Sequence, residues 1–262
     1  MKGFLEEASA AARSAGALQK ERLWSDVAIS FKGEGEVDLV TEVDRGCEEL
    51  IVARLKKAFP EHAFLAEENV YEKRDVPYKW IIDPLDGTTN YAHGYPWFCV
   101  SIGLEYEGEV VLGVIYHCMM DELFTAWKGG GAYLNGNPIR VSGREPLKRS
   151  LLATGFPYDR TRTNENNFLN FFNFQLAARA IRRAGAAALD LAYVAAGRLD
   201  GYWECKLKPW DVAAGSLLVA EAGGTVTNHA GLPYSVYDHR IVASNGVIHR
   251  EMLDVLKPAE EG

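Results

Sequence analysis

The chain contains the stretch Trp80-Ile81-Ile82-Asp83-Pro84-Leu85-Asp86-Gly87-Thr88-Thr89-Asn90, which decides most about its fold and its chemistry. An apolar strand pattern ends there in two carboxylates, Asp83 and Asp86. Pro84 fixes its own φ and lacks an amide donor, and the glycine after Asp86 permits a sharp bend, so the chain turns where the strand stops. The two carboxylates can then point to one spot with the Leu85 carbonyl, and such hard oxygen donors suit Mg²⁺. The alternative is a structural turn in which each aspartate caps nearby amides.

Two distant segments place further acids beside apolar elements. Phe64-Leu65-Ala66-Glu67-Glu68-Asn69 is a short apolar run that ends in paired acids. Pro209-Trp210-Asp211-Val212-Ala213-Ala214-Gly215 places an acid at the start of an apolar helix. Asp211 in that position would also serve as an ordinary helix N-cap, so a purely structural role stays open for it.

These three segments, in this order, resemble the signature of the inositol monophosphatase family, which are Mg²⁺-dependent, lithium-sensitive phosphatases. The resemblance runs over nearly the whole chain and implies a mixed α/β fold, the five-layered αβαβα sandwich. Antiparallel strands come first in the sequence and alternating elements follow, which predicts two parts. We expect residues 1–144 to form an α+β metal-binding part with an antiparallel sheet, and residues 145–262 an α/β part on the substrate side.

The periodicity of apolar residues gives the main elements. Apolar positions recur at helical spacing over 4–24, and Thr41 with Asp44 is typical of a capping box that opens a helix running to Pro60. Strand patterns cover 98–104, 110–116 and 122–126, and Asn135-Gly136 predicts a hairpin between 132–134 and 139–141. The remaining predictions are strands at 151–154, 180–183 and 241–244, and helices at 165–177, 187–196 and 211–222.

The resemblance implies a metal site built from acids. By that likeness Glu67, Asp83 and the Leu85 carbonyl bind a first Mg²⁺, and Asp83, Asp86 and Asp211 bind a second, while Glu67 can hold a weaker third. It also implies that a metal-activated water attacks the phosphate, and that Thr88, paired with Asp44, orients and helps to deprotonate this water. Glu67 belongs to the same catalytic group. The alternative for Thr88 and Asp44 is that each only caps a helix.

Substrate contacts follow from the same resemblance. The amides of Gly87 and Thr88 would take phosphate oxygens at a helix start. Glu204 matches the position at which the family presents a carboxylate to sugar or inositol hydroxyls, and Ala187 matches a wall of the substrate pocket beside Asp211. The alternatives are a surface acid at a strand end for Glu204 and a closely packed helix start for Ala187.

The net charge of −8 constrains the partners. An acidic protein does not attract nucleic acid through its overall field, so we expect no direct nucleic-acid binding. A pocket holding four acids would also repel a phosphate monoester unless cations lie between the two sets of anions. Metal dependence therefore follows from electrostatics as well as from the resemblance.

The preferred function is hydrolysis of a phosphate monoester, myo-inositol-1-phosphate, with two or three Mg²⁺ per subunit. One alternative is a fructose-1,6-bisphosphatase or a dual-specificity sugar phosphatase. Another, from a different class, is a transcription-antitermination partner that contacts RNA polymerase or an elongation factor. The resemblance further implies a homodimer, with Arg179, Arg182 and Arg183 near the interface or, alternatively, at an extra phosphate site. Four scattered cysteines and the lack of a long apolar run predict a cytoplasmic protein without a membrane span.

Overall fold

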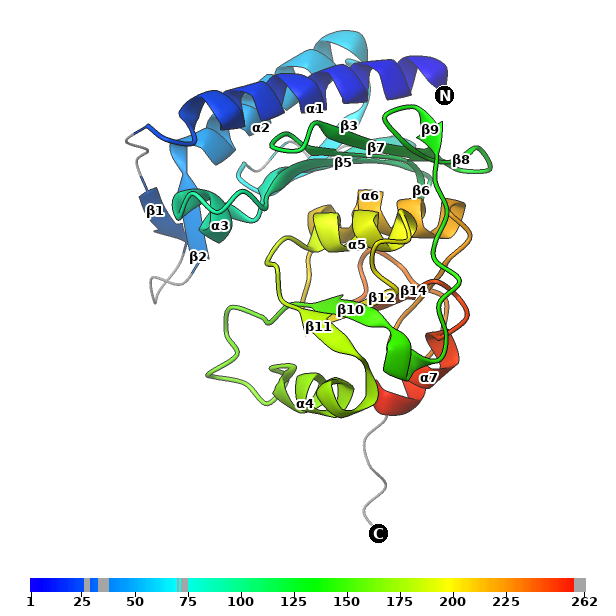
Figure 1. Cartoon of the computed structure of the whole chain (residues 1–262). Coiled ribbons are helices and arrows are strands. Elements are labelled where there is room, and N and C mark those ends of the chain that lie inside the picture. Colours follow the sequence, from blue (N-terminus) through cyan, green and yellow to red (C-terminus); the bar gives the residue numbers. More distant parts are fainter. Residues whose placement is uncertain (26–28, 33–37, 70, 72–74, 257–262) are drawn as a thin grey trace.

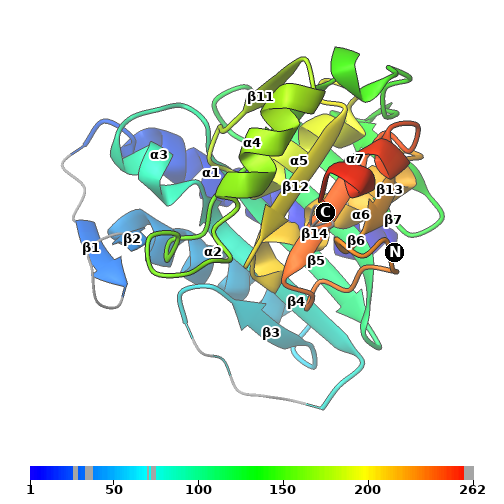
Figure 2. The same cartoon turned by 90° about the horizontal axis from the view of Figure 1, so that it is seen from below.

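The computed structural model describes residues 1–25, 29–32, 38–69, 71 and 75–256. Their elements stack in five layers, as Figure 1 shows. Helices α1 (Lys2–Arg22) and α2 (Glu42–Ala58) cover one face of a seven-stranded sheet, and α5 (Ala187–Ala195) and α6 (Pro209–Glu221) lie between that sheet and a five-stranded one. Helices α4 (Phe168–Ala177) and α7 (His249–Leu256) cover the outer face of the second sheet, and Figure 2 views the molecule from that side. The predicted αβαβα sandwich is therefore confirmed.

The seven-stranded sheet brings two acidic strand ends together. Its order is β3-β4-β5-β6-β7-β8-β9, and β3 runs parallel to β4 while every later pair is antiparallel. Ala66 pairs with Ile82, so the next residues of the two strands, Glu67 and Asp83, emerge side by side. The strands are β3 (Ala63–Ala66), β4 (Tyr78–Asp86), β5 (Cys99–Tyr106), β6 (Glu109–His117), β7 (Glu122–Trp127), β8 (Gly131–Leu134) and β9 (Asn137–Pro138).

The five-stranded sheet places its own strand ends at one edge. Its order is β11-β10-β12-β14-β13, and β10 is parallel to both β11 and β12. Thr154 pairs with Trp203, so Gly155 and Glu204 follow at the same level. The strands are β10 (Leu151–Thr154), β11 (Ala180–Arg182), β12 (Gly201–Cys205), β13 (Thr225–Thr227) and β14 (Arg240–Ser244). Outside the two sheets lie β1 (Ile29–Lys32), β2 (Asp38–Thr41), α3 (Thr88–Ala92) and a 3-10 turn at Leu147–Arg149.

Small residues let the middle helices approach the first sheet closely. A Cβ on Gly113 of β6 would lie 2.7 Å from the Ala214 carbonyl oxygen of α6, and one on Gly103 of β5 would lie 2.9 Å from the Ala213 Cβ. The Ser101 hydroxyl of β5 also donates to the Trp210 carbonyl at 3.3 Å. These contacts fix the first turn of α6, and with it Asp211, beside the sheet.

Most predicted elements are present, and their ends differ in informative ways. The capping box at Thr41 and Asp44 is confirmed. The hairpin turns at Asn135-Gly136, but its second strand is only Asn137–Pro138, so the strand predicted at 139–141 is wrong. Val141 instead donates its amide to the Ala222 carbonyl at the end of α6. Helix α6 starts two residues before the predicted position, since proline is favoured in a first helical turn.

Two simpler expectations can be compared with the same structure. All four cysteines are buried free thiols, as predicted. No helix in the described ranges has the length and apolar character needed to cross a membrane.

Helices α5 and α6 belong to the second half of the chain, yet their side chains share one apolar cluster with residues of β4, β5, β6, β7 and β8. The proposed division at 144 and 145 stays a prediction.

Candidate active site

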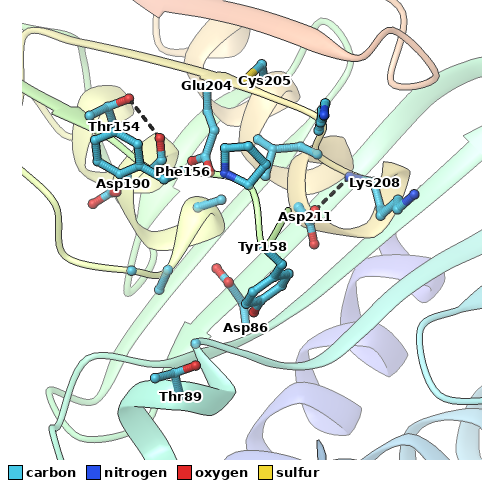
Figure 3. A pocket seen from close by; sticks show the side chains of 18 of the residues that line it. Asp86, Thr89, Thr154, Phe156, Tyr158, Asp190, Glu204, Cys205, Lys208 and Asp211 are labelled. Atoms are coloured by element: carbon cyan, nitrogen blue, oxygen red, sulfur yellow. Dashed lines mark hydrogen bonds between the residues drawn. The ribbon is translucent and has the colours of Figure 1, made fainter. Parts of the chain in front are cut away.

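A cavity of about 840 Å³ lies where the ends of β4 and β12 meet the first turns of α5 and α6. Figure 3 shows part of its lining, with Asp86 and Asp211 in the lower part of the view and Glu204 above them. Every predicted site residue except Asp44 lines it: Glu67, Asp83, Leu85, Asp86, Gly87, Thr88, Ala187, Glu204 and Asp211. Five separate elements of the chain thus contribute to one site.

A bulge explains how Asp83 and Asp86 face the same cavity. Residues three apart on a regular strand point to opposite faces. Here the pairing of β4 with β5 shifts between these positions, since Asp83 pairs with Ser101 while Asp86 pairs with Cys99. A bulge of this kind re-aims the side chains that follow it. The buried Gln19 of α1 accompanies it, donating to the Pro84 carbonyl at 2.8 Å.

Backbone amides hold each of the three aspartates. Asp83 Oδ1 accepts from the Leu85 amide at 3.0 Å, and Asp86 Oδ2 accepts from the Ala188 amide at 2.7 Å. Asp211, the third residue of α6, accepts from the Lys208 amide at 2.7 Å through Oδ2. Lys208 and not Asp211 is the N-cap of α6, so the N-cap role that we considered for Asp211 is wrong. Capping of a nearby amide nevertheless occurs for both Asp83 and Asp211. It uses one oxygen of each carboxylate and so orients the group without preventing a second role.

Mutual repulsion is the main electrostatic feature of this end of the cavity. Burial and then the charges of Glu67, Asp86 and Asp211 raise the pKa of Asp83 well above its ordinary value. Burial is also the largest cause that raises the pKa of Asp211, and the charge of Glu67 is the next largest. Burial raises the pKa of Asp86 to about 7, with the Ala188 amide opposing and the charges of Glu67 and Glu204 adding to the rise. Several anions in one poorly solvated space are stable together only when they share protons or cations.

The donor set of this cluster fits Mg²⁺. Carboxylates and one carbonyl are hard oxygen ligands, which is what this ion takes in proteins. Within the described residues, no three acidic, histidine or cysteine side chains already have the spacing of a ligated ion. The assignment of Glu67, Asp83, Leu85, Asp86 and Asp211 as metal ligands stays a prediction that rests on donor chemistry, register and shared charge. The Leu85 carbonyl oxygen also lies 3.1 Å from the Thr88 hydroxyl oxygen, farther than Asp44 Oδ1 at 2.8 Å.

Thr88 and Asp44 are paired. The Thr88 hydroxyl donates to Asp44 Oδ1 at 2.8 Å, across 44 residues of sequence. The other oxygen, Oδ2, accepts from the Thr41 amide at 2.8 Å and from the Thr41 hydroxyl, which completes the capping box of α2. Asp44 therefore both caps α2 and fixes Thr88 at the cavity wall. Gly87, with φ of 94°, is the N-cap of α3, so the alternative in which Thr88 caps this helix is wrong.

The opposite end of the cavity is also acidic. Glu204 on β12 is 8% exposed, so it is not a surface acid. Burial raises its pKa to about 7, while the Tyr202 hydroxyl bonded to Oε2 and the charge of Arg183 act against this rise. Ala187 is the first residue of α5 and lines the cavity, so the predicted helix start is confirmed and its contact with substrate stays a prediction.

Among the lining residues that were not predicted as site residues are Gly155 and Asp190, and Arg183, for which an extra phosphate site was the alternative, also lines the cavity. A Cβ on Gly155 would lie 2.3 Å from the Glu204 carboxylate oxygens, so this glycine makes room for Glu204. The signal in the sequence that could have identified Gly155 is its place in Thr154-Gly155-Phe156-Pro157, a turn directly after a predicted strand. Of the three arginines predicted at a dimer interface, Arg183 lines this cavity, and Arg179 lines a second one of about 560 Å³.

Comparison with known proteins agrees with this geometry. A family model described as the inositol monophosphatase family matches residues 1–260. The chain is 46% identical over 263 residues to the Nus factor SuhB of Pseudomonas aeruginosa, covering 98% of this chain and 97% of that protein. It is 47% identical over 255 residues to the inositol-1-monophosphatase of Synechocystis sp., covering 97% and 88% respectively.

Solved structures agree in the same way. The inositol monophosphatase from Anabaena (Nostoc) sp. is 44% identical, with a TM-score of 0.89 and coverage of 97% of this chain and 95% of that one. The extragenic suppressor protein suhB from Bartonella henselae is 40% identical, with a TM-score of 0.92 and coverage of 98% and 100%. The chain therefore belongs to the inositol monophosphatase family. It is a phosphatase of that family, whose members generally depend on Mg²⁺ and act on phosphate monoesters.

Proposed function

We propose that this protein hydrolyses the phosphate monoester of a polyol, with myo-inositol-1-phosphate as its substrate. The observation that carries this proposal is the position of Glu204, a buried carboxylate in the same cavity as the aspartate cluster. The aspartate end suits an anionic phosphate only with cations present, and the Glu204 end suits a neutral group rich in hydroxyls.

Glu67, Asp83, the Leu85 carbonyl, Asp86 and Asp211 would hold two or three Mg²⁺ ions. When bound, these ions would neutralise the phosphate and the acids and make an attacking water more acidic. The amides of Leu85, Ala188 and Lys208 orient the carboxylates of Asp83, Asp86 and Asp211. Occupation of one of these positions by lithium is part of the same proposal.

Thr88 and Asp44 would handle the proton of the attacking water. The Thr88 hydroxyl has one hydrogen, which it donates to Asp44 Oδ1 at 2.8 Å, so its lone pairs remain to accept a hydrogen bond from water. As the water loses its proton to Thr88, Thr88 can pass its own hydrogen to Asp44, and no charge is left on the hydroxyl. The amides of Gly87 and Thr88 would bind phosphate oxygens.

A panel of phosphate esters tests this function. Phosphate release would be measured from myo-inositol-1-phosphate, fructose-1,6-bisphosphate and adenosine 3′,5′-bisphosphate, each with Mg²⁺ and with EDTA as the control. We expect the highest kcat/KM with inositol phosphate and no release in EDTA. A higher kcat/KM with fructose-1,6-bisphosphate would favour the sugar phosphatase alternative, and release in EDTA would contradict the metal site.

A transcription role is a second candidate, because the relatives from Pseudomonas aeruginosa and Vibrio cholerae, at 46% and 43% identity, are named Nus factor SuhB. We propose testing it by pull-down with RNA polymerase and elongation factors, comparing the wild-type protein with Asp83→Asn. Capture of both would support a scaffold role that is independent of catalysis. Capture of neither would remove this candidate.

A homodimer is the third proposal. Helix α4 exposes four large apolar side chains, each at least 49% exposed, and such a face needs cover. They are Phe168, Leu169, Phe172 and Leu176. Sedimentation of the wild-type protein and of Phe172→Glu tests this proposal, since a dimer that uses this face should dissociate in the variant.

A further inference from the structure

Asp190 is a buried acid that the chemistry above does not use. It is the fourth residue of α5, it is 2% exposed, and it lines the active-site cavity. Its Oδ1 is buried and has no hydrogen-bond partner among the described residues. An unpaired polar atom in such a place costs stability, so a fold tolerates it where an incoming group supplies the missing bond.

A second buried aspartate shows what a purely structural role looks like. Asp200 is 0% exposed, and its Oδ1 accepts from Arg144 Nη1 at 3.0 Å and from the Ser142 hydroxyl. Its Oδ2 accepts from the Leu151 amide at 2.7 Å. Both oxygens of Asp200 are therefore paired within the fold, whereas Oδ1 of Asp190, a residue that lines the cavity, has no partner among the described residues.

Asp190 lies at the end of the cavity that contains Glu204, which we call the polyol end. Burial raises the pKa of Asp190 well above its ordinary value, the charges of Glu204 and then Asp86 add to the rise, and the charge of Arg183 opposes it. In Figure 3 Asp190 and Glu204 both lie above Asp86. Helix α5 packs on β12, so the two acids come from neighbouring elements. Two carboxylates here accept hydrogen bonds from hydroxyls and repel another anion.

We propose that Asp190 is a specificity-determining residue that accepts a hydrogen bond from a hydroxyl of the leaving polyol, next to the hydroxyl held by Glu204. The pair selects a neutral leaving group with adjacent hydroxyls and rejects a substrate that would place a second phosphate there. This inference rests on the proposed function, since it concerns the same reaction at the same site.

The test compares Asp190→Asn and Asp190→Leu with wild type on three substrates: myo-inositol-1-phosphate, fructose-1,6-bisphosphate and p-nitrophenyl phosphate. Loss of one hydrogen bond should raise KM for inositol phosphate about three- to tenfold in Asp190→Leu, with kcat nearly unchanged. The constants for p-nitrophenyl phosphate, which has no hydroxyl, should stay within about twofold of wild type. Asp190→Asn keeps a side-chain oxygen that can accept the hydroxyl, so its KM for inositol phosphate should lie between those of wild type and Asp190→Leu.

Thermal stability separates this role from a structural one. Removal of an unpaired buried carboxylate should raise Tm by about 2–4 °C in Asp190→Leu. The matched control, Asp200→Asn, should instead lower Tm and leave the substrate preference unchanged. A lower Tm in both Asp190 variants with unaltered KM, or equal KM changes for all three substrates, would overturn the proposal for Asp190. No phosphate release from inositol phosphate by the wild-type protein would overturn the proposed function itself, and this inference with it.

Discussion

The two ends of the active-site cavity are both lined by buried acids, yet they differ in what holds those acids. At the aspartate end, Asp83, Asp86 and Asp211 each accept one backbone amide and crowd one another. At the polyol end, Glu204 accepts from a tyrosine hydroxyl and Asp190 keeps an unpaired oxygen. We expect the first arrangement to require cations and the second to bind hydroxyl donors.

This difference shows that the neighbours of a carboxylate decide its role. At the aspartate end burial raises the pKa of each aspartate and neighbouring carboxylates add to the rise, so we expect divalent cations to bind there. A carboxylate that is buried beside only one or two others can instead remain a hydrogen-bond acceptor.

Replacement of Asp83 by asparagine should abolish turnover. The change removes a charge that we expect two cations to share, so kcat should fall by a factor of about 10³ or more. Phosphate release from myo-inositol-1-phosphate measures it. The same variant should melt higher than wild type in EDTA, because a buried, repelled charge is gone. The charge-matched control is Asp121→Asn, which changes an exposed aspartate in the turn that follows β6. Activity in Asp83→Asn near that of the control would show that the aspartate end is only structural.

Replacement of Thr88 by alanine should lower kcat about 100-fold, because the hydroxyl between water and Asp44 is lost. Thr88→Ser keeps that hydroxyl and should restore most of the rate. Asp44→Asn should lower both kcat and Tm, since Asp44 also completes the capping box of α2. Steady-state kinetics and thermal melts of the three variants separate the two roles. Equal rates for the alanine and serine variants would remove Thr88 from the proton path.

The aspartate end could be predicted from sequence because its signals are local. Asp83 and Asp86 lie in one motif with a proline between them, and Thr41 with Asp44 forms a capping box within four residues. The layered fold followed from the family resemblance, since periodicity alone gave the elements and not their stacking. Element ends were less exact, because tertiary contacts such as the Val141 amide with Ala222 replaced the expected strand pairing.

The polyol end could be predicted only in part because it depends on distant contacts. Glu204 and Ala187 were identified by resemblance, but Gly155 and Asp190 were not. The space that Gly155 leaves is needed only because β10 and β12 end side by side, 49 residues apart in sequence. Asp190 lies in an apolar helix whose pattern suggests a core position, and only the structure shows its unpaired oxygen.

Replacement of Glu204 by glutamine should raise KM for inositol phosphate about tenfold and change kcat less, because a charged acceptor of hydroxyl groups becomes a neutral one. Glutamine keeps an oxygen for the Tyr202 hydroxyl, so the fold around β12 should be retained. Kinetics with p-nitrophenyl phosphate serve as the control, since this ester has no polyol to bind. Unchanged constants for both substrates would place Glu204 outside the binding site.

The smallest effect should appear in the pH dependence of stability without divalent ions. Burial raises the pKa of Glu204 from 4.5 to about 7 and that of Asp86 from 3.8 to about 7. When the pKa of a group is higher in the folded state than in the unfolded state, protonation of that group stabilises the fold. This stabilisation is complete at pH values below the unfolded-state pKa, and it is lost as the pH rises through the folded-state pKa. Tm in EDTA should therefore fall between about pH 5 and pH 8.

Two comparisons make this melting experiment specific. Glu204→Gln should have a shallower fall, because one of the titrating groups is gone while the aspartate end is intact. Added Mg²⁺ should remove much of the remaining fall, since the ion favours ionised aspartates. If Tm in EDTA instead rose over this pH range, the acids at both ends would have to be stabilised in their charged forms by the fold itself. The distinction between a cation-requiring end and a hydroxyl-binding end would then be lost.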